Sequence, residues 1–231
     1  MKMAEAAPAP ARFVPVRPKS LPESVAEQLR EAILSGQVKP GERLIEQKLA
    51  VLFGIGQPTV REALKQLEHQ GFVTKLPNRA TFVTDLSEAD MEKMFDVRMV
   101  LETLAIERAA PRITPDSMEI LRGHLADMEI AAQVMNLSAF QQCDIAFHHA
   151  IWDLSGNEYL ATALDRIVPA LFAFVLLKRH GNREGYLASI RQHQEILEGL
   201  ATGDPIEARQ AFRRSTQGYW HLHHKVRIAD A

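Results

Sequence analysis

Hydrophobic residues near the N-terminal end of the chain recur at helical spacing. Val25, Leu29 and Ile33 lie four residues apart, which places them on one face of a helix. The segment Ser20–Glu23 before them reads Ser-Leu-Pro-Glu and has the form of a capping box, in which two side chains bind backbone amides of the first turn. Gly36 follows the last apolar position and marks the helix end. The pattern therefore predicts one amphipathic helix with a defined start and a defined end.

Two further helices are predicted close behind the first. One covers about residues 43–53 and ends before Gly54, and the other runs from Pro58 to Gly71 with the proline in its favoured first position. The link between them, Gly54-Ile55-Gly56-Gln57, is short and contains two glycines. This arrangement is typical of the turn in a helix-turn-helix motif.

Two short β-prone runs follow the third helix. They are Phe72–Lys75 and Thr81–Thr84, and the residues between them include Arg79, so the spacing predicts a hairpin with a basic tip. Three helices and such a hairpin make a winged helix-turn-helix. In that motif the third helix enters the major groove of DNA, and the hairpin reaches the adjacent backbone or minor groove. A small three-helix module that docks onto another protein would show the same pattern.

The rest of the chain is predicted to be helical. Helix-start signals and punctuating glycines divide it, and no β-prone run interrupts it. The helices are expected over about residues 87–110, 114–134, 138–154, 157–179, 183–202 and 204–226. We therefore predict a mainly α fold, with an N-terminal winged helix-turn-helix and a C-terminal antiparallel six-helix bundle, whose interior is a usual place for a ligand or a metal.

Composition excludes several classes of protein. The chain has 231 residues, of which 46% are hydrophobic and 24% charged, as in soluble globular proteins. A single cysteine, Cys143, excludes an internal disulfide framework and multi-cysteine metal sites. The longest strongly apolar run, Ile167–Leu177, has 11 residues, whereas a membrane helix needs about 20. We expect no membrane partner and a cytoplasmic location.

Charge is distributed unevenly along the chain. The formal net charge is −2, but residues 1–86 carry +3 and residues 87–231 carry −5. The Ala/Pro-rich segment 1–19 is typical of a flexible arm. We therefore expect this arm, a winged helix-turn-helix DNA-binding domain over residues 20–86, and an all-helical domain over residues 87–231. The positive excess agrees with nucleic-acid binding, although ordinary surface variation also reaches this size.

Polar residues at the start of the predicted third helix are suited to contact bases. Arginine prefers guanine, and glutamine can form two hydrogen bonds with adenine. Basic and amide side chains on the second helix and in the hairpin, Lys75 included, suit phosphate contacts. For each of them a solvated surface role is the alternative. The candidate DNA-binding residues are Arg43, Gln47, Lys48, Gln57, Thr59, Arg61, Lys65 and Arg79.

A second set of polar residues lies in the predicted bundle. Asp144 and His148 are four residues apart, so both project from one helix face and can chelate a divalent cation or form a surface hydrogen bond. His193 on a later helix is a third candidate ligand, and such a site can leave positions open to water or an effector. Arg98 can anchor an effector carboxylate, or it can pair with Glu102 in the next helical turn.

Two sets of motifs match a known family. In the first domain they are Ala32-Ile33, Gly36, Pro40-Gly41, Leu44, Leu49-Ala50 and above all Pro58-Thr59-Val60-Arg61-Glu62-Ala63-Leu64. In the second domain they are Arg98 with Leu101-Glu102, Asp144-x-x-Phe147-His148, Gly156-Asn157, and His193 before Ile196-Leu197. With these motifs the chain resembles the GntR family of bacterial transcription regulators, in the FadR-like branch whose effector domain is called FCD. Six helices match the shorter variant of this bundle better than the seven-helix variant.

The resemblance implies a homodimer that binds a palindromic operator, and a small carboxylate effector that binds in the FCD bundle and changes the affinity for DNA. Gly56-Gln57 stand where the family usually has Ser-Arg, and Gln47 stands where an arginine is common, so the operator is expected to differ from the common family sequence. The third metal histidine of the family falls on Ser215, whose hydroxyl is a poor ligand for a transition metal. Whether Asp144, His148 and His193 bind one divalent ion, zinc or similar, is therefore left open.

The leading hypothesis is a ligand-responsive transcription regulator and not an enzyme. Di-iron catalysis in helical bundles uses repeated Glu-x-x-His pairs. None of the nine histidines has a glutamate three residues before it, so this chemistry is excluded. The alternative is a winged-helix adaptor that binds a protein partner and never touches DNA.

Overall fold

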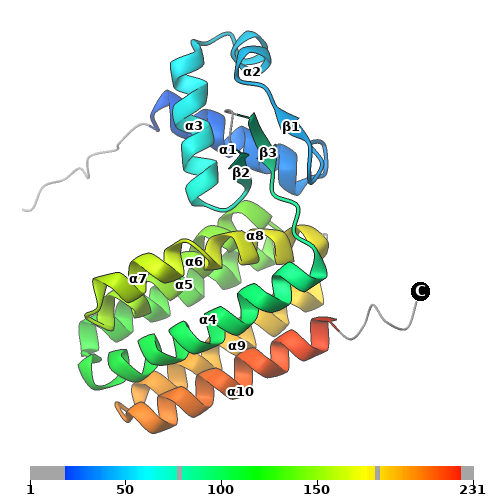
Figure 1. Cartoon of the computed structure of the whole chain (residues 1–231). Coiled ribbons are helices and arrows are strands. Elements are labelled where there is room, and N and C mark those ends of the chain that lie inside the picture. The colour runs from blue at the N-terminus through cyan, green and yellow to red at the C-terminus, as the bar shows by residue number, and fades with distance from the viewer. Residues whose placement is uncertain (1–18, 77–79, 180–182, 225–231) are drawn as a thin grey trace, which may run out of the picture.

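The computed structural model describes residues 19–76, 80–179 and 183–224 of the chain. Figure 1 shows a small N-terminal domain above a larger helical bundle. This arrangement confirms the predicted mainly α fold, with a winged helix-turn-helix ahead of an all-helical domain. Arg79 and nearly all of the predicted arm lie outside the described residues. The domain boundary between residues 86 and 87 stays a prediction.

The N-terminal domain holds three helices and a three-stranded antiparallel sheet with the strand order β1-β3-β2. Its elements are α1 (Leu21–Leu34), β1 (Arg43–Leu44), α2 (Glu46–Phe53), α3 (Gln57–His69), β2 (Val73–Leu76) and β3 (Ala80–Val83). The predicted capping box is present at α1. The Ser20 hydroxyl accepts from the Glu23 amide, and the Glu23 carboxylate accepts from the Ser20 amide. β2 and β3 form the wing.

The second helix begins at Glu46, so the prediction of a helix from residue 43 was wrong. Arg43 and Leu44 form the edge strand β1, which pairs with β3. Leu44 is buried and Arg43 is exposed, and this alternation is the period of a strand rather than of a helix. Ile45 continues in an extended conformation before α2 starts. Arg43 therefore lies at the sheet edge beside the wing.

A glycine in the left-handed conformation makes the tight turn between α2 and α3. Gly54 has a φ of 65°, and its amide hydrogen-bonds to the carbonyls of Ala50 and Val51, which end α2. Behind the turn, Ile33, Leu67 and Phe72 have no exposed surface and hold the helices against the sheet. A well-packed core thus fixes the start of α3 with respect to β1.

The bundle contains seven α-helices in the residues that the structure describes, not the six that were predicted. They are α4 (Glu88–Ala109), α5 (Pro115–Gln133), α6 (Leu137–Leu154), α7 (Glu158–Asp165), α8 (Val168–Arg179), α9 (Arg183–Ala201) and α10 (Pro205–His224), with the short 3₁₀ helix η1 (Ala110–Arg112) after α4. The helix predicted over 157–179 is divided into α7 and α8. The match to the shorter six-helix variant was therefore wrong.

Pro169 explains the division. A proline has no backbone N–H and its ring clashes with the carbonyl four residues earlier, so one helix cannot run unbroken through Asp165 and Pro169. The chain instead ends α7 at Asp165 and starts α8 at Val168, which leaves Pro169 in a first turn where no such bond is needed. Helix α8 therefore has a separate axis from α7, and it lies beneath the N-terminal domain (Figure 1).

The bundle helices pack around fully buried side chains that include Ile106, Leu121, Phe147 and Phe212. α6 lies against α4 and α5, and α9 lies against α5 and α10, so polar residues of α6 and α9 can meet inside the bundle. Among the described residues, no helix is both long enough and apolar enough to cross a membrane.

The two domains are packed against each other through α8 and α6. Gly71 has a φ of 77°, and a Cβ added there would lie 2.2 Å from the amide nitrogen of Ala170 in α8. Ala173, one turn later in α8, belongs to the buried cluster of the N-terminal domain. Arg30 of α1 is buried. The side-chain oxygen of Gln142 on α6 is turned toward α1 and accepts from both terminal nitrogens of Arg30. Helix α6, which carries Asp144 and His148, therefore also touches the N-terminal domain.

Candidate functional site

A shallow groove lies between β1, the starts of α2 and α3, and the wing. Its volume is about 520 Å³. Arg43, Gln47, Gln57 and Arg61, which are four candidate DNA contacts from the sequence, line the groove together with Lys75 of β2. The fold thus brings residues that are up to 32 positions apart to one basic and amide-rich surface.

The remaining DNA candidates lie elsewhere or are not described. Thr59 is half-buried on the first turn of α3. Lys48 is exposed on α2 and Lys65 is exposed on α3, where it pairs with Glu62 at 2.8 Å, but neither lines the groove. Arg79 lies outside the described residues.

Glu46, which the sequence analysis did not single out, holds Arg61 within the groove. Nη2 of Arg61 donates to Oε2 of Glu46 at 2.8 Å, and Nε donates to both carboxylate oxygens at 3.2 and 3.3 Å. Both side chains remain partly exposed, at 47% for Arg61 and 22% for Glu46. The hydrogen bonds and charge of Glu46 raise the pKa of Arg61. The pair links the first turn of α2 to α3.

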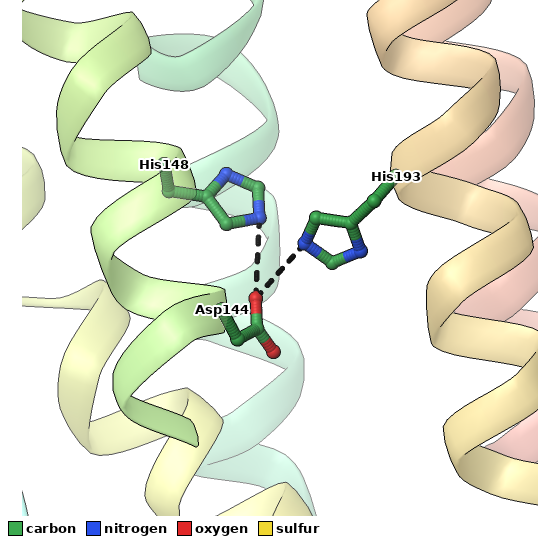
Figure 2. A group of neighbouring side chains, drawn as sticks. All are labelled: Asp144, His148 and His193. Atoms are coloured by element: carbon green, nitrogen blue, oxygen red, sulfur yellow. Dashed lines mark hydrogen bonds and ion pairs between the residues drawn. The ribbon is translucent and has the colours of Figure 1, made fainter. Parts of the chain in front are cut away.

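In the bundle, Asp144 and His148 of α6 and His193 of α9 meet (Figure 2). Oδ1 of Asp144 lies 3.0 Å from Nε2 of His193 and 3.6 Å from Nε2 of His148. One possible ligand atom from each of the three residues lies within 4.8 Å of the other two. Both histidines are buried and Asp144 is nearly so. The three residues that the sequence analysis proposed as metal ligands therefore form one cluster.

The other nitrogen of each ring is already occupied. Nδ1 of His193 lies 2.7 Å from the carbonyl oxygen of Ser189, which can only accept, so that nitrogen carries the proton. Nδ1 of His148 faces the carboxylate of Glu102. When both imidazoles are neutral, each has one N–H, so both Nε2 atoms present lone pairs toward the Asp144 carboxylate, whereas a protonated His193 donates from Nε2 to Oδ1 of Asp144.

Three acceptors thus converge on one point. A proton on one imidazole or a bound cation would satisfy them. Two imidazole nitrogens and a carboxylate oxygen are ligands that zinc and similar divalent ions accept, and outer partners such as Glu102 and Ser189 orient metal-binding histidines in this way. The donor set therefore fits a divalent metal with positions left for other ligands.

Glu102 is the charged centre behind the cluster. It has no exposed surface and receives Nε of Arg98 at 2.6 Å and Nε1 of Trp152 at 3.0 Å, besides His148. Burial alone would raise the pKa of Glu102, but the charge of Arg98 and the hydrogen bonds from His148 and Arg98 outweigh it and hold that pKa well below its usual range. Burial also lowers the pKa of His148, which keeps this ring neutral and able to bind a metal.

Asp144 has a lowered pKa as well. Burial raises it, but the charge of a protonated His193 and the hydrogen bond that its Nε2 donates outweigh burial. The carboxylate is therefore ionised at neutral pH, which is the form that binds a cation. With both imidazoles neutral, Arg98 is the cation that lies beside the carboxylates of Glu102 and Asp144.

Arg98 pairs with Glu102, the alternative that the sequence left open. Its guanidinium also lies 4.5 Å from the ring centre of Phe172, and Phe172 packs edge-on against His148 with 5.0 Å between ring centres. Within the described part of the chain, Nη2 of Arg98 is buried without a hydrogen-bond partner. Arg98 thus keeps one free donor next to the cluster.

Ser215, at the position of the family's third histidine, is buried on α10. Its hydroxyl donates to the carbonyl of Phe212 at 3.2 Å within its own helix. Sequence reasoning missed Ser189, Trp152 and Phe172 as partners of the cluster. Only the fold brings Trp152 to Glu102 and Phe172 to His148, since these contacts join separate helices, whereas Ser189 lies one turn before His193 on α9.

Comparison with known proteins gives consistent results for both domains. The family described as "FCD domain" matches residues 93–218, and the one described as "Bacterial regulatory proteins, gntR family" matches residues 21–83. A gluconate operon transcriptional repressor of Bacillus licheniformis is 27% identical over 184 residues, which cover 78% of this chain and 75% of the relative. The HTH-type transcriptional repressor NanR of Escherichia coli is 28% identical over 241 aligned positions, which cover 91% and 88%.

Among solved structures, that of E. coli McbR/YncC is similar in fold. The TM-score is 0.70 at 22% sequence identity, and the match covers 90% of this chain and 98% of the other. Relatives and fold neighbours are transcription regulators and not enzymes.

Proposed function

This chain is a transcription regulator of the GntR family with an FCD effector domain, and from that premise we propose that it binds a palindromic DNA operator as a homodimer and that a small carboxylate in the bundle sets its affinity for DNA. The observation that carries the proposal is the meeting of Asp144, His148 and His193 in a buried cluster whose surrounding helices also contact the DNA-binding fold.

The groove supports the DNA-binding part. Gln57 and Arg61 lie in the first two turns of α3, the part of a recognition helix that reaches base edges. Gln47 approaches from α2, and Arg43 and Lys75 lie on the sheet, where cations can contact phosphates. With glutamines at positions 47 and 57, adenine contacts are expected in addition to the guanine contact of Arg61.

An exposed apolar stripe supports the homodimer. Val97, Val100 and Leu104 on the outer face of α4 are 44%, 70% and 43% exposed. If two copies of α4 pair antiparallel about Val100, Glu92 of one copy comes opposite Arg108 of the other, so opposite charges flank the stripe. Val100→Glu is expected to convert a dimer to a monomer in light scattering, whereas the exposed Ile120→Glu on α5 is expected to leave the dimer intact.

The cluster supports an effector that carries a carboxylate. Asp144, His148 and His193 would hold one divalent ion, and an ion with open positions supplies a Lewis-acidic point to which a carboxylate can bind. The buried free donor of Arg98 offers a second contact for such a group. One relative is named for the gluconate operon, and gluconate is a carboxylate, which agrees with this chemical class.

The packing around α8 supports communication between the two sites. Phe172 contacts His148 and Arg98, while its neighbour Ala173 belongs to the buried cluster of the N-terminal domain. A ligand that moves His148 or Arg98 therefore acts on a helix that the DNA-binding fold rests on.

Selection of duplexes from a random-sequence pool tests the proposal. The wild-type chain is expected to enrich a palindrome, and zinc together with a library of small carboxylates is expected to change the affinity for that duplex. Asp144→Asn should abolish the response to zinc while leaving DNA binding in its absence intact. Enrichment of no duplex would overturn DNA binding and favour the adaptor alternative, and equal zinc responses of both chains would overturn the role of the cluster.

A further inference from the structure

The contact between Glu46 and Arg61 fixes which edge of the arginine is free. A guanidinium has five N–H donors, and Glu46 occupies the one on Nε and one on Nη2. The donors that remain belong to Nη1 and to the far side of Nη2. These two nitrogens form an end-on fork that points away from Glu46, and such a fork matches O6 and N7 of guanine.

The location of Glu46 has an electrostatic consequence as well. Glu46 lines the same groove as Arg43, Arg61 and Lys75, so its negative charge faces the surface that we assign to DNA. A carboxylate there weakens the attraction of any phosphate backbone, whatever its sequence. The same residue is therefore expected to act in opposite directions on non-specific binding and on base readout.

We propose that Glu46 is a positioning residue for base readout: it holds the Arg61 guanidinium in the end-on orientation and so raises discrimination for guanine at the expense of general affinity for DNA. The inference rests on the proposed DNA binding and deepens it. Orientation is gained before binding, because the bonds to Glu46 restrict a long and flexible side chain that would otherwise lose rotamer freedom on the base.

Glu46→Gln tests this role. The glutamine keeps the shape of the side chain, but it is neutral and has only one oxygen that can accept the Arg61 hydrogen bonds. The measurements are the affinities for the duplex that the wild-type chain enriches from a random pool and for a shuffled duplex of equal length and composition. We expect affinity for the enriched duplex to fall about tenfold, as for loss of one oriented base contact, and affinity for the shuffled duplex to stay equal or to rise.

Glu62→Gln is the matched control. Glu62 neighbours Arg61 on α3 and pairs with Lys65, and its removal takes the same charge from the same domain without touching the Arg61 and Glu46 contact. In this variant both affinities are expected to change in the same direction, with their ratio kept within about twofold. The double variant Glu46→Gln with Arg61→Ala is expected to show the same ratio of affinities for the enriched and shuffled duplexes as Arg61→Ala alone, because Glu46 acts on base readout through Arg61.

Three results would overturn the inference. They are an affinity ratio in Glu46→Gln that is unchanged with both affinities kept, a ratio that is unchanged because both affinities fall in parallel, which marks a structural role, and losses of this ratio that add up in the double variant. Failure of the wild-type chain to enrich any duplex is a different outcome, since it overturns the proposed function itself.

Discussion

One arginine–glutamate pair in each domain lies at a candidate functional site, and the two pairs differ mainly in their exposure. In the DNA-binding domain, Arg61 and Glu46 are 47% and 22% exposed. In the bundle, Arg98 and Glu102 are 6% and 0% exposed, and Glu102 also receives Trp152 and faces His148. The contacts are chemically alike, but only the exposed pair can exchange a partner with solvent or DNA at low cost.

The difference indicates what each pair can do. An exposed pair contributes little to folding, so its geometry is available for recognition. A buried pair cannot lose one member without leaving an uncompensated charge in a low-dielectric interior. Glu102 therefore fixes the tautomer and position of His148 through a framework that the fold itself maintains, whereas Glu46 acts on Arg61 with little consequence for the fold.

The largest expected effect is from Glu102→Gln. The substitution keeps the volume but leaves Arg98 buried without its counter-charge, so the free energy of unfolding in urea is expected to fall by about 3–5 kcal/mol. It also removes the carboxylate behind His148, and zinc affinity is expected to fall about 10- to 100-fold.

Glu107→Gln on the same helix is the control for that prediction. Glu107 pairs with Arg209 at 3.4 Å, with the two side chains 35% and 40% exposed, so its loss is expected to cost less than about 1 kcal/mol. Equal unfolding free energies for the two variants would show that the buried pair contributes no more to stability than the exposed pair.

The sequence predicted most of the exposed region and only part of the buried one. Three helices, the wing and the groove residues Gln57 and Arg61 follow from local signals such as the capping box and the glycine turn. The start of α2 was missed because Arg43 and Leu44 pair with a strand about forty residues away, and a short apolar–polar alternation does not reveal such a partner.

In the bundle, spacing along α6 placed Asp144 and His148 on one face, and the third ligand was found through family resemblance. The partners Trp152 and Phe172 could not be predicted, because each contact depends on how separate helices pack. Ser189 lies one turn before His193 on the same helix, and its carbonyl is a local partner that only the orientation of the His193 ring reveals. The break before α8 was missed although Pro169 signals it, since the apolar run Ile167–Leu177 continues across the junction and was interpreted as part of a single helix.

Ser215→His tests the ligand set of the buried cluster. If position 215 faces the cluster, as the family resemblance implies, a third imidazole completes the ligand set, and zinc affinity measured by competition with a chromophoric chelator is expected to rise about a hundredfold. Thr216→His one position along serves as control, since it points elsewhere on α10 and its hydroxyl already accepts from Gln192. Equal zinc affinities of Ser215→His and the wild-type chain would show that position 215 does not face Asp144.

Arg61→Ala tests the exposed side. The affinity for the enriched duplex is expected to fall about 10- to 100-fold, while the unfolding free energy stays close to that of the wild-type chain, because the pair with Glu46 is exposed. Lys48→Ala is the comparison variant. As a candidate phosphate contact outside the groove, Lys48 is expected to weaken binding to all duplexes alike and to lower the salt dependence. A uniform loss in Arg61→Ala as well would remove its assignment to base readout.

The smallest expected effect concerns the link between the two regions. Phe172→Leu removes the aromatic ring that touches Arg98 and His148 from a helix whose next residue, Ala173, is buried among the N-terminal domain's core residues. If zinc acts on DNA affinity through this helix, its effect on the affinity for the enriched duplex is expected to shrink about threefold, with zinc binding itself nearly unchanged. Val175→Ala, on the same helix but packed against a different cluster, is expected to keep the full zinc effect. Because both variants retain α8, an equal zinc effect in the two would place the coupling elsewhere, with the contact between Arg30 and Gln142 as the other packed route between the cluster helices and the DNA-binding fold.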